Sequence, residues 1–73
     1  MMVIPGELRQ GTSEITPVDV CVGAGRAWIS DGDVFMILSD VQEDHCFYVL
    51  FGSTIGKMHI SFVIKETKRI WPP

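Results

Sequence analysis

The sequence predicts an all-β fold, a small barrel of about five short strands. β-forming residues gather in short runs, turn residues separate these runs at intervals of roughly ten residues, and no stretch keeps the apolar period of a long helix. The chain has 73 residues, which is room for one domain. A domain of this size buries only about 60% of its unfolded surface, so the 47% hydrophobic content must go mainly into a single core.

Residues 1–14 are expected to form a flexible N-terminal arm that precedes the barrel, residues 15–73. The arm mixes Pro5, Gly6 and Gly11 with charged residues and shows no sustained period. Pairing of residues 1–4 as an edge strand is left open.

The barrel strands follow from alternation between turn signals. Val18, Val20 and Val22 share one face of a strand, while Asp19 and Cys21 take the other. Polar or glycine-rich segments then separate the later runs. The predicted strands are 18–22, 27–30, 34–38, 46–51, a short piece at 57–60, and 67–71; the predicted turns are 39–45 and 52–56. Residues 61–66 are expected to form one helical turn with Ser61 as its N-cap.

The order of these segments resembles the Src-homology-3-like (SH3-like) barrel. GDVFMIL is followed by a polar loop, FYVLF, a glycine turn, GKMHISFV and a closing strand that ends in KRI. The resemblance implies a five-stranded barrel over residues 18–71, with a single 3₁₀ turn before the last strand. GDVFMILSDV with FYVLFGSTIGKMH is also similar to a pattern in small SH3-like proteins of tailed bacteriophages.

The sequence departs from the SH3 domains that bind polyproline. Those domains line a groove with aromatic residues, including a pair of tryptophans, and carry a proline in the 3₁₀ turn. Here Phe47 and Tyr48 stand where the tryptophans would be, and His59 stands near the place of the proline. Polyproline recognition is therefore not expected.

The two central strands carry apolar residues on both faces. The SH3-like register directs one alternate set into the core and the other outward, and a slip of one residue would exchange the sets. The expected core is Phe35, Ile37, Phe47, Val49, Phe51, Val18, Val20, Val22, Phe62 and Ile70. The expected outward set is Val34, Met36, Leu38, Tyr48 and Leu50.

An outward apolar set needs something to cover it. The arm, with Val3, Ile4 and Leu8, is one candidate; a protein-binding surface and self-association are the others, because contiguous apolar patches on small proteins tend to mark interfaces. Arg26 and Trp28 are a further pair of partner-binding candidates, since exposed Arg and Trp residues are frequent hot spots. Packing of Trp28 over the barrel end is the alternative.

Charge argues against a general nucleic-acid surface. Residues 1–64 carry three cations and eight acids (3 − 8 = −5), and residues 65–73 carry three cations and one acid (+2). Lys68, Arg69 and Trp71 form a small cluster that could contact phosphates and bases. A solvated edge strand is the alternative for this segment.

Few residues suggest chemistry. Asp40, Glu43, Asp44 and His45 crowd one loop next to Cys46, and Cys21 with His59 would complete a nominal two-Cys, two-His set. The spacing does not resemble a zinc finger, so we expect no metal and no cofactor. No nucleophile has a plausible base, so we expect no enzyme activity. We expect reduced cysteines, no signal peptide, no membrane span and a cytoplasmic location, with a Cys21–Cys46 disulfide as an alternative.

These observations together predict a non-enzymatic interaction module. The resemblance to phage proteins implies that the partner is a larger host protein, with bacterial RNA polymerase as the candidate and regulation of transcription as the effect. A structural or assembly module of a phage particle is the alternative, and a weak nucleic-acid-binding barrel is a further one. The expected state is a monomer or weak self-association.

Overall fold

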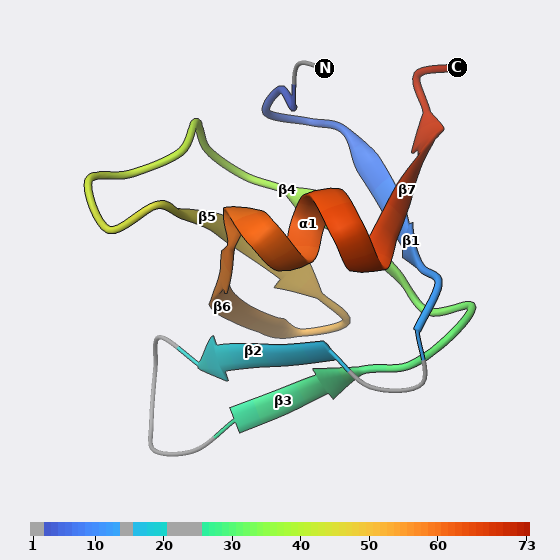
Figure 1. Ribbon diagram of the computed structural model, residues 1–73, viewed down its shortest axis with the longest axis horizontal. Helices are drawn as coiled ribbons and strands as arrows, with labels where there is room; N and C mark the ends of the chain where they lie inside the picture. Colours follow the sequence, from blue (N-terminus) through green and yellow to red (C-terminus); the bar gives the residue numbers. More distant parts are fainter. Residues whose placement is uncertain (1–2, 14–15, 21–25) are drawn as a thin grey trace.

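The computed structural model describes residues 3–13, 16–20 and 26–73. The fold consists mainly of short strands, with one helix before the last strand (Figure 1). The strands are β1 (Leu8–Gly11), β2 (Thr16–Val20), β3 (Arg26–Ile29), β4 (Val34–Ile37), β5 (Cys46–Phe51), β6 (Thr54–His59) and β7 (Thr67–Trp71), and the helix is α1 (Ile60–Glu66). The prediction of a mainly β protein is confirmed, and the strands predicted at 46–51 and 67–71 have the expected bounds.

The strands pair in the order β3-β2-β6-β5-β4-β1-β7, with antiparallel pairing throughout. β6, β5, β4, β1 and β7 form a five-strand sheet, and the β2–β3 hairpin joins β6 through the pairs Asp19–Lys57 and Val20–Gly56. No pairing joins β3 to β7 within the described residues, so the sheet is not closed into a barrel. β7 carries Lys68 and a register shift against β1, and Pro72 follows it directly; such features oppose further strand pairing.

Strand β1 corrects the prediction of an arm over residues 1–14. Residues 8–11 form an inner strand of the sheet, paired with β4 on one side and with β7 on the other. Within the same segment Val3 packs against the core. The segment LRQG lacks an apolar alternation because its inward side chain, Arg9, is a buried cation.

The core confirms the predicted register of the central strands. Val18, Phe35, Ile37, Phe47 and Val49 are buried, and Phe51 is partly buried. The predictions for Phe62 and Ile70 are wrong, because both side chains are exposed; Ile29, Met58 and Val63 occupy the core instead. The side chain of Val20 and all of Val22 lie outside the described residues.

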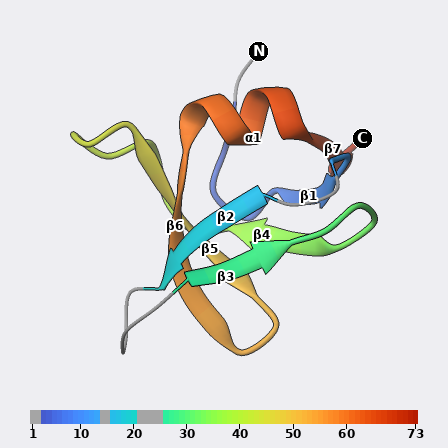
Figure 2. The ribbon, with the colours of Figure 1, turned by 60° about the horizontal axis from the view of Figure 1, so that its bottom comes forward.

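Helix α1 is longer than the expected 3₁₀ turn and begins earlier. It has seven residues, and its N-cap is His59 rather than Ser61: the Nδ1 atom of His59 accepts a hydrogen bond from the Ser61 amide at 3.1 Å. α1 lies above the strands in Figure 2 and buries Val63 against them. The predicted turn at 52–56 is also shorter, since β6 begins at Thr54.

Buried polar groups join the end of α1 to β1. The Arg9 guanidinium donates to Glu7 Oε2 at 2.6 Å and to the hydroxyl of Thr67 at 2.8 Å. It also donates to the carbonyl oxygens of Val63 and Thr67, both at 3.2 Å. The Val63 carbonyl oxygen, in the last turn of α1, also accepts a hydrogen bond from the Thr67 hydroxyl, so Arg9 and Thr67 together join this turn to the start of β7.

Candidate functional site: the outer face of the sheet

The candidate site is the face of the five-strand sheet opposite the core. Directly paired residues of neighbouring antiparallel strands point to the same face. The strand pairings link Trp71 to Leu8, Leu8 to Met36, Met36 to Leu50, and Leu50 to Ile55. One apolar row therefore crosses the five strands of this sheet, and its Trp71–Leu8 pair lies at the register shift between β1 and β7.

Shorter rows lie on either side of this central row. Lys68 pairs with Gln10, which pairs with Val34. On the other side the Leu38 amide donates to the Tyr48 carbonyl at 2.8 Å, and Tyr48 pairs with Lys57. We call these three rows together the outer face; its members are Leu8, Gln10, Val34, Met36, Leu38, Tyr48, Leu50, Ile55, Lys57, Lys68 and Trp71.

The outer face is accessible to a partner. Val34 is 43% exposed, Ile55 46% and Trp71 58%, while Leu8, Met36, Tyr48 and Leu50 are partly exposed. The described part of the N-terminal segment is not the lid that was one candidate cover, because Leu8 is itself a member of the face and Val3 packs against the core.

An ion pair borders the face at the β6 side. Lys57 Nζ lies 2.7 Å from Asp44 Oδ2 and 5.3 Å from the centroid of the Tyr48 ring. The hydrogen bond from Lys57 lowers the pKa of the Asp44 carboxyl, and the same bond raises the pKa of Lys57. Lys57 thus lies over the Tyr48 ring within the distance of a cation–π interaction.

The predicted site residues divide between separate parts of the molecule. Val34, Met36, Tyr48 and Leu50 lie together on the outer face, as the register predicted. Leu8 and Ile55 belong to the same row and were not predicted, since the strand at 8–11 was not recognised and Ile55 was assigned to a turn.

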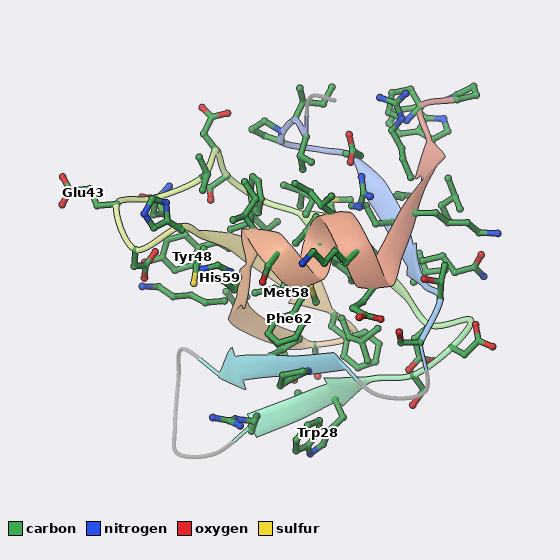
Figure 3. The ribbon with its side chains drawn as sticks, in the orientation of Figure 1. Trp28, Glu43, Tyr48, Met58, His59 and Phe62 are labelled. Atoms are coloured by element: carbon green, nitrogen blue, oxygen red, sulfur yellow. The ribbon has the colours of Figure 1, made fainter. Side chains whose placement is uncertain are left out.

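Arg26 and Trp28 lie on β3, outside the five-strand sheet: Arg26 pairs with Asp19 of β2, which pairs with Lys57 of the Tyr48 row, and Trp28 pairs with Pro17. Trp28 is 50% exposed, and Figure 3 shows it on the side of the hairpin away from α1. Arg26 therefore lies on the extension of the row that holds Lys57 and Tyr48, whereas Trp28 pairs with no residue of the five-strand sheet.

The small basic cluster of β7 is divided between the two sides of the strand. Lys68 is paired with Gln10 on the outer face, whereas Arg69 is paired with the inward-facing Arg9. Arg69 Nη1 lies 3.9 Å from Glu7 Oε1. Trp71 shares the outer face with Lys68, as a member of the central row.

A pocket of about 310 Å³ lies between the β2–β3 hairpin, β5, β6 and the start of α1. Its lining is Pro17, Arg26, Cys46, Lys57, His59 and Phe62, and Figure 3 shows Phe62 between α1 and the hairpin. His45 and His59 approach edge to face with their ring centroids 6.3 Å apart. Within residues 3–13, 16–20 and 26–73, no group of three or more His, Cys, Asp or Glu side chains is placed to hold a metal ion. Cys21, and with it the alternative of a disulfide to Cys46, lies outside the described residues.

In the part of the chain that the structure describes, no helix is long and apolar enough to cross a membrane. Comparison with known proteins finds no matching family model, no similar curated protein and no similar solved structure.

Proposed function

We propose that this protein is a non-enzymatic interaction module that binds a larger protein through its outer face. The observation that carries the proposal is the continuous row of Trp71, Leu8, Met36, Leu50 and Ile55 across five strands. Small soluble proteins rarely leave such a contiguous apolar surface without a partner. Burial of these side chains against a partner would supply the main free energy of binding.

We further propose that the fold is an open relative of the SH3-like barrel. The order of elements supports this relation: a Gly-Asp pair precedes β4, a hairpin joins β5 to β6, and a helical segment precedes β7. The resemblance to small SH3-like phage proteins makes a cytoplasmic host enzyme the candidate partner. Bacterial RNA polymerase is the example to test, with regulation of transcription as the effect.

Four of the described ionisable groups are held in ion pairs. Glu7 and Arg9 are buried and paired with one another, and Asp44 pairs with Lys57. Each of these groups already has a structural partner, so none is poised to transfer a proton to a substrate.

The test is capture of partners from a bacterial lysate by the tagged protein, compared with Tyr48→Asp and Leu50→Asp. A carboxylate on this face would have to be desolvated without a partner, so both variants should lose capture. Val41→Asp is the matched control, because Val41 is 44% exposed and lies in the loop between β4 and β5.

The expected result is one large host complex, retained at high salt by the wild type and by Val41→Asp, and lost by both face variants. Equal capture by all four proteins would refute binding through this face. Recovery of the protein itself alone would favour a self-associating structural module.

A further inference from the structure

The five strands that form the outer face contain no carboxylate. Their sequences are LRQG, VFMI, CFYVLF, TIGKMH and TKRIW. The whole chain nevertheless carries nine acids and a net charge of −3. The face therefore differs in charge from the rest of the molecule.

The cations of this face are Lys57 and Lys68, and they lie at opposite sides of the apolar row. Lys57 is already paired with Asp44 from the neighbouring loop. Lys68 is exposed, and no described carboxylate lies within ion-pair distance of it. The β7 side of the face is thus the side that can accept a new negative charge.

We propose that the outer face binds an apolar protein segment that carries a carboxylate, with this carboxylate beside Lys68 and the apolar side chains over Leu8, Met36 and Leu50. This inference rests on the proposed function and specifies the chemistry of the partner. Complementary charge at the rim of an apolar interface sets its orientation and suppresses wrong partners.

A second copy of the chain fits this face poorly. Two outer faces packed together would bring Lys68 of both copies to an interface in which the five strands supply no carboxylate, since Asp44 is already paired with Lys57. Unpaired charges at a buried interface cost free energy.

A nucleic acid also fits poorly. Asp33 directly precedes β4, and Asp40 and Asp44 lie in the loop that follows it. A continuous polyanion crossing the sheet along β4 would pass these acids. A protein segment with one or two carboxylates near β7 would not pass these acids. The distribution of acids therefore favours a protein partner.

The test uses peptides and the full chain. Two synthetic peptides alternate leucine with glutamate or leucine with lysine, and an oligothymidylate of similar length is the third probe. Binding is measured from backbone amide shifts in NMR spectra of the wild type, Lys68→Glu, Tyr48→Asp and the control Lys65→Glu. Lys65 is exposed on α1, away from the outer face.

The glutamate peptide should shift the amides of Leu8, Met36 and Leu50 and bind about tenfold tighter than the lysine peptide at low salt. Lys68→Glu should weaken binding of the glutamate peptide about fivefold and strengthen binding of the lysine peptide. Lys65→Glu should change the affinity for neither peptide.

Tighter binding of the oligothymidylate at this face, or no binding of either peptide there, would overturn the inference. Equal binding of both peptides that is lost in Tyr48→Asp would overturn the acidic partner but leave the proposed function standing. Peptide binding that Tyr48→Asp does not weaken would count against both.

Discussion

Replacing Arg9 by methionine should destabilise the protein severely. Methionine keeps much of the apolar stem but removes the guanidinium, which donates to Glu7, to the Thr67 hydroxyl and to two carbonyl groups near the end of α1. Arg9 is 2% exposed and Glu7 is 0% exposed. Arg9→Met would therefore remove this donor from the buried Glu7 carboxylate and from the Thr67 carbonyl, while the Val63 carbonyl would keep its hydrogen bond from the Thr67 hydroxyl.

Removing one partner of a buried ion pair costs about 3–5 kcal/mol. At roughly 0.05–0.15 kcal/mol per residue, the 73 residues give a total stability of about 4–11 kcal/mol. Arg9→Met should thus remove about half of the free energy of unfolding or abolish folding. Urea unfolding at pH 7, followed by circular dichroism, measures the change.

Two further variants distinguish loss of the buried Glu7–Arg9 ion pair from nonspecific destabilisation by the substitution. Glu7→Gln combined with Arg9→Met should be more stable than Arg9→Met alone, because the buried negative charge is gone. Arg69→Met should cost less than about 1 kcal/mol, since the Arg69 side chain is 44% exposed and lies 3.9 Å from Glu7. A loss below about 1 kcal/mol for Arg9→Met would refute the structural role assigned to this network.

Three other substitutions test the fold and its surface charges. Phe47→Ala should lower the free energy of unfolding by about 2–4 kcal/mol as a core truncation; an effect within measurement error would mean that the register of β5 is wrong. Gly11→Ala should cost about 1–3 kcal/mol, because its Cβ would lie 2.5 Å from the Ser30 carbonyl oxygen; an unchanged urea midpoint would show that β1 does not approach β3 so closely. Asp44→Asn should remove a pH dependence: Lys57 lowers the pKa of Asp44 below 3.8, so the contribution of this pair is present above that pH and is lost as the pH falls further. Stability curves of the wild type and Asp44→Asn that remain parallel down to pH 2 or so would contradict the ion pair.

The strands β4, β5 and β7 could be predicted because their apolar runs end at clear turn residues. Both faces of β4 and β5 are apolar, so the division between core and outer face came from the SH3-like register, and the buried set confirms it for these two strands. Register follows directly from a two-residue period once one face is known to be buried.

Strand β1 could not be predicted in the same way. Its inward positions are Arg9 and Gly11, which read as a polar loop by hydrophobic pattern alone. Arg9 is buried because Glu7 and the end of α1, 54 residues or more along the chain, supply acceptors for it. Such compensation depends on tertiary contacts and leaves no local signal.

The end of the chain shows a second limit. The SH3-like register predicts Phe62 and Ile70 in the core, and both side chains are exposed. The phase of α1 directs Val63 inward instead, and the register between β1 and β7 shifts next to Leu8 and Arg9. A shift of one position exchanges buried and exposed side chains, and it cannot be located from composition.

Hydroxyl-radical footprinting of the complex with the captured host protein tests the outer face most directly. Met36, Tyr48 and Trp71 have side chains that oxidise readily and lie on this face, while Trp28 is 50% exposed on β3 and serves as an internal control. Binding through the outer face predicts protection of Met36, Tyr48 and Trp71 in the complex, with unchanged oxidation of Trp28. Protection of Trp28 without protection of Met36 and Tyr48 would contradict it and would assign binding to the β2–β3 hairpin.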